Sequence, residues 1–176
     1  MKNKILSIGF LLILLSPKPA FTQTDYEKYH SALKAIKTGQ EDFAFLDLLS
    51  LTKEDPQSKY RLVSLFACGE YYFHKFNYRQ ALNIFSEFIE DYPDSKIKPY
   101  ALFYILKIAK SWKNAEMVEI LENKIRDMKQ VILVFKETNE YKYRYTSILG
   151  RKYKLIYHID RVEFNVDGEI VEQVSY

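Results

Sequence analysis

The sequence predicts an α+β protein, in which an all-helical solenoid of three repeats precedes a small C-terminal antiparallel β-meander. Two observations carry this prediction. The pattern of apolar residues and prolines recurs at a spacing of 37 residues up to about residue 128. Beyond that point apolar and charged residues alternate, which is the period of a strand and not of a helix. We therefore expect a signal peptide at residues 1–23, helical repeats at 24–130 and the β-meander at 131–176.

The first 23 residues have the features of a signal peptide. Lys2 and Lys4 precede an apolar run from Ile5 to Leu15, and small residues follow around Ala20. This run is shorter than the roughly 20 apolar residues that span a bilayer. We expect export to the periplasm, cleavage near Gln23 and a soluble product; an uncleaved anchor or a buried strand are the alternatives that the pattern leaves open.

The helical repeat is clearest in two polar turns. Residues 55–59 read DPQSK and residues 92–96 read YPDSK, so both contain Pro-x-Ser-Lys at the same phase. The same shift superposes Ala44, Ala81 and Val118. Turn chemistry alone would not keep small and large apolar residues in register, so the period indicates a structural repeat.

Each repeat is predicted to be a pair of helices. Asp25 is expected to cap the first helix, Gly39 to end it, and Pro93 to stop the fourth, because proline lacks the amide donor. The apolar spacings predict helices at 25–37, 41–53, 60–75, 79–92, 100–112 and from 115 to about 128.

The rest of the chain is predicted to form three or four strands. An apolar run at 131–137 predicts a buried strand, and two tyrosine-rich alternating segments follow on either side of Gly150. A phase shift near Asp160 predicts a bulge or bend. Asp167-Gly168 predicts a type I′ hairpin turn into the last strand.

The middle repeat resembles the tetratricopeptide repeat family. The residues at that family's spacings are Leu65, Cys68, Gly69, Tyr72, Ala81, Phe85, Phe88 and Pro93. The resemblance is weaker in the first repeat and degenerate in the third, where Glu122 and Gln130 replace a large apolar residue and the proline. The segment 85–95 is most similar to bacterial envelope members, of the outer-membrane assembly lipoprotein and Tol-binding periplasmic types. The chain lacks the lipidated cysteine of the first type and the coiled coil of the second.

This resemblance implies a concave surface, lined by the first helix of each pair, that binds a protein or peptide of the cell envelope. The family's contact positions correspond here to Tyr26, Tyr29, Phe66, Phe73, His74, Tyr100, Phe103, Lys107 and Lys110. We expect a non-enzymatic adaptor that uses this aromatic face. The alternative is a structural subunit in which the β-meander fills the groove, and a strand edge or a solenoid end makes the contacts, including those of a homo-oligomer.

Composition argues against other classes of function. The chain has 26 basic and 23 acidic residues, and the three excess lysines all belong to the expected signal peptide, so no nucleic-acid partner is expected. Cys68 is the only cysteine, which excludes an internal disulfide. His30, His74 and His158 lack metal-site spacing, and we expect no enzyme, cofactor, metal or integral membrane segment in the mature chain.

Charge is segregated within the predicted β-meander. Residues 129–161 hold eight basic and three acidic residues, whereas residues 162–176 hold four acidic residues and no basic one. A basic strand face beside tyrosines suits anionic lipid headgroups or nucleic acid. Its other interpretation is the solvated side of a half-buried sheet, with the tyrosines turned inward.

Overall fold

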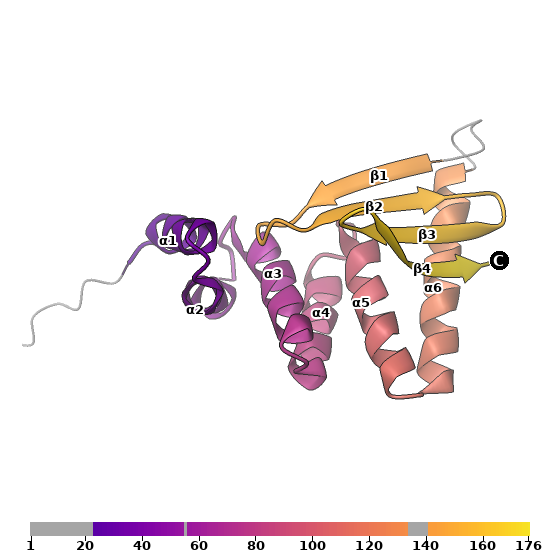
Figure 1. Ribbon diagram of the computed structural model, residues 1–176, viewed down its shortest axis with the longest axis horizontal. Coiled ribbons are helices and arrows are strands. Elements are labelled where there is room, and N and C mark those ends of the chain that lie inside the picture. The colour runs from indigo at the N-terminus through magenta and orange to yellow at the C-terminus, as the bar shows by residue number, and fades with distance from the viewer. Residues whose placement is uncertain (1–22, 55, 134–140) are drawn as a thin grey trace, which may run out of the picture.

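The computed structural model describes residues 23–54, 56–133 and 141–176, and it contains six helices followed by one four-stranded antiparallel sheet (Figure 1). The helices are α1 (Asp25–Lys37), α2 (Glu41–Lys53), α3 (Arg61–His74), α4 (Tyr78–Asp91), α5 (Lys98–Ser111) and α6 (Ala115–Leu133). The strands are β1 (Tyr141–Thr146), β2 (Lys152–Tyr157), β3 (Arg161–Val166) and β4 (Glu169–Ser175). The predicted α+β class, with helical repeats before a β-meander, is confirmed.

The 37-residue period reappears in the backbone of the helix pairs. The second helices of the three pairs begin at Glu41, Tyr78 and Ala115, each 37 residues after the last. The turns inside the pairs repeat as well, since the same phase holds residues with positive φ: Gly39 (73°), Phe76 (59°) and Lys113 (54°). The amide that follows each of them donates to a carbonyl five residues earlier, which is the Schellman ending of a helix.

The N-cap of helix α1 lies one residue before the cap predicted at Asp25. Thr24 is the N-cap, and its hydroxyl accepts a 3.3 Å hydrogen bond from the Glu27 amide. The Glu27 carboxylate in turn accepts a 2.8 Å bond from the Thr24 amide. This reciprocal capping box satisfies two amides that the first turn leaves unpaired.

Close packing within the second pair depends on Gly69 of α3. A Cβ atom at this position would lie 2.6 Å from the ring of Phe85 in α4. That ring is fully buried and stacks on Tyr104 of α5, with 4.9 Å between centroids. The absence of a side chain at Gly69 therefore lets three successive helices approach one another.

Arg61 joins the first helix pair to the second. Its Nε donates a 3.1 Å hydrogen bond to the carbonyl of Thr52 in α2, and its guanidinium pairs with Glu87 and Asp91 of α4. The free-energy cost of removing this nearly buried cation from water is offset by its three acceptors. The side chain therefore ties α2 to α4.

The structure corrects the predicted start of the β region. Helix α6 continues to Leu133, so the strand predicted from Val131 is wrong over its first three residues, and the β region begins later than the predicted boundary at residue 131. The remaining residues of that prediction, 134–137, lie outside the described residues. The strand phase shift near Asp160 is a chain reversal between β2 and β3, where the His158 amide donates to the Arg161 carbonyl.

The sheet is a meander of strand order β1-β2-β3-β4. The predicted hairpin is confirmed, because Asp167 and Gly168 have φ of 53° and 96° and Val166 pairs with Glu169. The register shifts between Phe164 and Asn165, so the bulge in this region lies between β3 and β4 and not near Asp160.

The sheet packs along α5 and extends from α3 at one end to α6 at the other (Figure 1). One continuous hydrophobic core contains buried side chains of the second and third helix pairs and of the strands. A second, smaller core joins the first pair to α3, and Ile148 and Leu149 of the β1–β2 loop pack against it.

Candidate functional site

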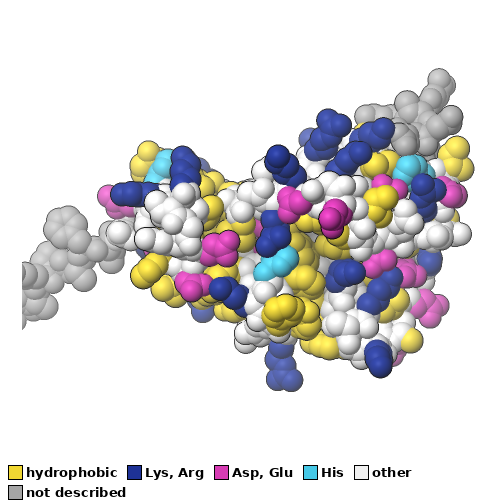
Figure 2. All heavy atoms as spheres, viewed as in Figure 1, with side chains coloured by type: hydrophobic (Ala, Val, Ile, Leu, Met, Phe, Trp, Pro, Cys, Tyr) yellow, Lys and Arg dark blue, Asp and Glu magenta, His cyan; other side chains and the backbone are white. Residues whose placement is uncertain are grey.

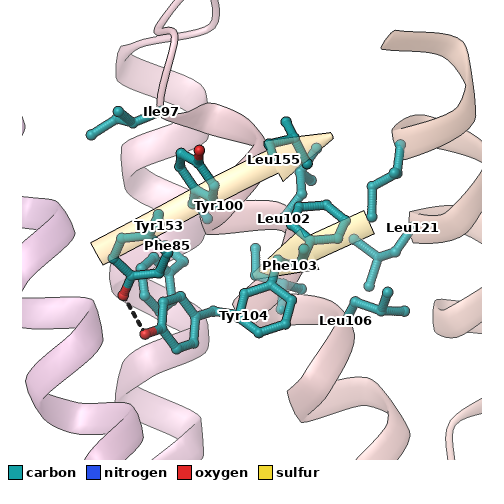
Figure 3. Close-up of a cluster of buried hydrophobic side chains, with 14 of the residues drawn as sticks. Phe85, Ile97, Tyr100, Leu102, Phe103, Tyr104, Leu106, Leu121, Tyr153 and Leu155 are labelled. Carbon is teal, nitrogen blue, oxygen red and sulfur yellow. Dashed lines mark hydrogen bonds between the residues drawn. The ribbon is translucent and has the colours of Figure 1, made fainter. Parts of the chain in front are cut away.

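The predicted concave face of the second and third helix pairs is covered by the protein's own sheet. The Phe66 ring meets Tyr145 and Tyr153 edge-on, with centroids 5.5 and 5.8 Å apart. Phe103 stacks on Phe164 of β3 at 5.3 Å. Figure 3 shows Tyr100, Phe103 and Tyr104 of α5 directed toward the strand side chains Tyr153 and Leu155.

Three predicted partner-binding residues are therefore inaccessible. The exposed fractions of Phe66, Tyr100 and Phe103 are 0%, 1% and 4%, and the Tyr100 hydroxyl donates to the carbonyl of Tyr143. The prediction of an open aromatic groove is wrong at these positions. The physical reason is that the inward tyrosines of β1 and β2 supply the apolar partner that the groove would otherwise take from another chain.

The two lysines at the far end of the predicted groove are also engaged by the sheet. Lys110 Nζ lies 3.1 Å from the Glu172 carboxylate, and Lys107 Nζ donates to the carbonyl of Val171 at 3.4 Å. Both partners belong to β4. These lysines anchor the last strand to α5, and this interpretation replaces the predicted one in which they bind a partner.

Phe73 and His74 lie at the margin of the covered region. Phe73 is half-buried, and its ring packs 4.8 Å from that of Tyr104, whereas the His74 side chain is exposed and meets the Tyr104 ring edge-on at 6.2 Å. Partial desolvation, followed by the nearby charge of Arg151, lowers the pKa of His74 to about 4. The imidazole is therefore neutral at pH 7.

A buried polar chain crosses the interface between helices and sheet. The Tyr153 hydroxyl donates a hydrogen bond to Oε1 of Glu70. The hydroxyl oxygens of Tyr153 and Tyr104 lie 2.5 Å apart (Figure 3). Burial raises the pKa of Glu70 to about 8, which the hydrogen bond from Tyr153 opposes only in part. Glu70 and Tyr153 are 83 residues apart in the chain, and no pattern in the sequence links them.

The first helix pair presents the same face without a cover. The outline of the molecule dips between this pair and the sheet (Figure 2). Tyr26 is 59% exposed, and its ring lies 4.1 Å from that of the neighbouring His30. Tyr29 is half-buried and stacks on Tyr60 at 4.2 Å. Of the predicted site, these two tyrosines lie on a helical face that the sheet leaves uncovered, and His74 is exposed at the margin of the covered face.

A pocket of about 310 Å³ lies where the turn between α4 and α5 meets β1 and β2. The repeated Pro-x-Ser-Lys turn forms one wall, from Pro93 to Lys96, and tyrosines of both strands form the other. The sequence did not predict this pocket. The turn motif was visible in the sequence, but nothing there indicated that the fold would place it beside the tyrosine-rich strands.

Within residues 23–54, 56–133 and 141–176, no group of three His, Cys, Asp or Glu side chains is placed to hold a metal ion. Cys68 is buried in the smaller core, and burial raises the pKa of its thiol well above the usual range. A protonated, enclosed thiol is a poor nucleophile.

Comparison with known proteins gives no relative: the chain matches no protein-family model and no curated protein. None of the described helices combines the length and the apolar character needed to cross a membrane.

Proposed function

We propose that this protein is a non-enzymatic interaction protein of the cell envelope, which binds a partner protein through its first helix pair. The carrying observation is a difference between equivalent positions. Tyr100 of α5 is 1% exposed beneath the sheet, whereas Tyr26, at the same phase of α1, is 59% exposed. The surface that the second and third pairs use to hold the sheet is thus vacant on the first.

The covered groove favours a specific form of this proposal. The sheet covers the second and third helix pairs as an internal partner. The partner protein makes the same kind of contact with the first pair. The exposed Tyr26 ring, the half-buried Leu33 and Ile36 and the exposed Lys37 suit a segment with apolar and acidic side chains. The resemblance to tetratricopeptide repeats and the 37-residue phase of the helices support this assignment.

Export to the periplasm belongs to the same proposal. It rests on the lysines, apolar run and small residues of the first 23 positions, which except for Gln23 lie outside the described residues. Fractionation of expressing cells, with N-terminal sequencing of the recovered protein, tests it. A product that begins near Gln23 in the periplasmic fraction is expected; an intact N-terminus in the cytoplasm would overturn this part.

The binding surface is tested by site-specific photo-crosslinking in envelope extracts. A photo-reactive residue at Tyr26 is expected to capture one defined protein, and the same residue at Phe43 is not. Phe43 is a suitable control. It is exposed on the same helix pair, but it lies in α2 and not in the helix that carries the proposed contact residues.

A substitution completes this test. Tyr26→Ser with Lys37→Ser should abolish recovery of the partner, while Phe43→Ser with Leu46→Ser should leave it unchanged; all four side chains are exposed, so both variants should fold. Loss of the partner from the second variant alone would move the site to the outer face of α2.

A further inference from the structure

The outward face of β1 and β2 is a basic surface. Because side chains alternate across a strand, burial of the tyrosines against the helices turns Lys142, Arg144, Lys152 and Lys154 to the opposite face. Figure 2 shows Lys and Arg side chains gathered above this part of the sheet. The charge segregation in the sequence therefore becomes a segregation in space.

These cations repel one another. Arg144 lies directly opposite Lys154 in the antiparallel register, an arrangement of like charges that destabilises a sheet. In the part of the chain that the structure describes, Arg144, Lys152 and Lys154 have no carboxylate within ion-pair distance of their side chains. The outward carboxylate of β3, Glu163, is instead occupied by Asn165, Gln173 and neighbouring basic groups.

The basic surface is also hollowed. A depression of about 340 Å³ is lined by Arg144, Thr146, Lys152, Lys154 and Asn165, and it reaches Gly168 of the hairpin turn. Three cationic groups and a hydroxyl around one depression match the oxygens of a phosphate group, which accept several hydrogen bonds at once. The depression therefore has room and hydrogen-bond donors for a phosphate group within a broader positive field.

An exposed apolar side chain lies beside this recess. Ile170 pairs with Asn165 across the β3–β4 ladder, so it shares the outward face, and it is 56% exposed. A basic patch with an adjacent exposed aliphatic group suits the boundary between headgroups and acyl chains of a membrane. An acidic peptide or a nucleic acid would use the cations but would gain nothing from Ile170.

We propose that the outward face of β1 and β2 binds the surface of a membrane that contains anionic phospholipids, with a headgroup phosphate held among Arg144, Lys152 and Lys154. Ile170 enters the adjacent interface. This site is separate from the surface proposed on the first helix pair, so a partner protein and a membrane can be bound together. The two proposals stand or fall independently.

Co-sedimentation with lipid vesicles tests the proposal. The chain from Gln23 onward, which contains every described helix and strand, is mixed with phosphatidylcholine vesicles with or without phosphatidylglycerol. Binding is expected only to the anionic vesicles and should weaken as salt rises, because exposed charges are screened. Equal binding to both vesicles, or to neither, would overturn the proposal.

Substitutions define the surface. Arg144→Gln with Lys154→Gln should lower vesicle affinity roughly thirtyfold, since each basic group near an anionic surface contributes roughly fivefold. Lys34→Gln with Lys124→Gln removes the same charge from exposed helical positions and should lower affinity far less. Arg144→Lys with Lys154→Arg should retain binding, and Ile170→Ser should weaken it without changing its salt dependence.

Two competitions identify the source of the anion. Inorganic phosphate should release the protein no better than sodium chloride of the same ionic strength; selective release would reassign the recess to a free anion. Immobilised polyglutamate should retain wild type and the Ile170→Ser variant weakly and equally. Retention as strong as on anionic vesicles would reassign the face to an acidic protein.

Discussion

Glu70 shows how a single side chain couples the helices to the sheet. Its carboxyl group is fully buried on an aromatic helical face, and Oε1 accepts a hydrogen bond from the Tyr153 hydroxyl. Oε2 has no hydrogen-bond partner among the described residues. Burial raises its pKa from 4.5 to about 8. The group is thus mainly neutral at pH 7, which removes most of the penalty of enclosing a charge.

This pKa shift predicts that stability falls as pH rises from 7 to 8. In this range the unfolded chain has released the Glu70 proton and the folded chain still holds it, so folding takes up a proton and weakens with pH, by up to about 1.4 kcal/mol per unit. The stability is full below pH 4.5 and is lost as pH rises through 8. Urea denaturation of wild type at each pH measures the slope.

The control is Glu70→Gln, which can accept the same hydrogen bond but cannot ionise. Its free energy of unfolding should vary less between pH 7 and 8. The range below pH 6.5 is avoided because His74, with its pKa lowered to about 4, has the opposite sign and gains stability as pH rises there. Identical slopes in both proteins would refute the role assigned to Glu70.

The residue scale also marks the limit of prediction from sequence. Phe66, Tyr100 and Phe103 were correctly placed on one helical face by the 37-residue phase, but the sequence left open whether a partner or the β-meander covers them. An apolar face has the same pattern whether a partner or the chain itself covers it. Glu70 and Tyr153 are 83 residues apart in the chain, and no local pattern links such a pair.

Among the elements, the α3–α4 pair depends on the close approach at Gly69. We predict that Gly69→Ala lowers the free energy of unfolding by about 1–2 kcal/mol, because overpacking against the fixed Phe85 ring outweighs the higher helix propensity of alanine. Thermal and urea denaturation measure the loss. Adding Phe85→Leu to this variant should cost less than Phe85→Leu alone costs wild type; simple additivity of the two effects would show that the ring is not what alanine meets.

The turn of the same pair carries local strain. Phe76 has φ of 59° and is 79% exposed, whereas the equivalent position of the first pair is Gly39. Phe76→Gly should raise the free energy of unfolding by about 0.5–1 kcal/mol, since the left-handed conformation is unfavourable for a residue with a Cβ.

Phe76→Ala separates strain from side-chain exposure in this turn. Alanine removes the exposed ring but keeps the Cβ atom, so it should not stabilise the protein. If alanine and glycine raised stability equally in urea titrations, the cause would be the ring and not the backbone.

Elements with a short-range signal were predicted well. The period of 37 located all three helix pairs, because it repeats the same local apolar spacings and turns. Asp167-Gly168 located the final hairpin, because a two-residue turn depends on adjacent residues alone. The end of α6 was missed, since the run from Val131 is short and apolar, and such runs fit a strand or a buried helix equally. The reversal after Tyr157 was predicted only as a bulge or bend, because strand alternation resumes immediately beyond it.

Over the whole molecule, the two hydrophobic cores are joined by the sheet. The larger core holds helices and strands together, and Ile148 and Leu149 of the β1–β2 loop pack on the smaller core of the first pair. Neither core can be exposed without disturbing that loop. We therefore expect the described helices and strands to unfold as one cooperative unit.

Cys68 provides the probe for this expectation. It is buried in the smaller core, and burial raises the pKa of its thiol, so a thiol reagent should not label it in the native protein. Labelling should begin at the same urea concentration at which tyrosine near-ultraviolet circular dichroism, which reports the sheet–helix interface, is lost. Labelling at distinctly lower urea would mean that the first pair opens separately.

The sheet that occupies the groove also sets an order of events during synthesis. The helices precede the strands in the chain, so the aromatic side chains of α3 and α5 emerge before the residues that will cover them. Until β2 and β3 arrive, the nascent protein displays the adhesive surface that the finished protein conceals. A chain that stalls after α6 would therefore be the most aggregation-prone form, and the cell's holding chaperones would meet a face that the folded protein buries.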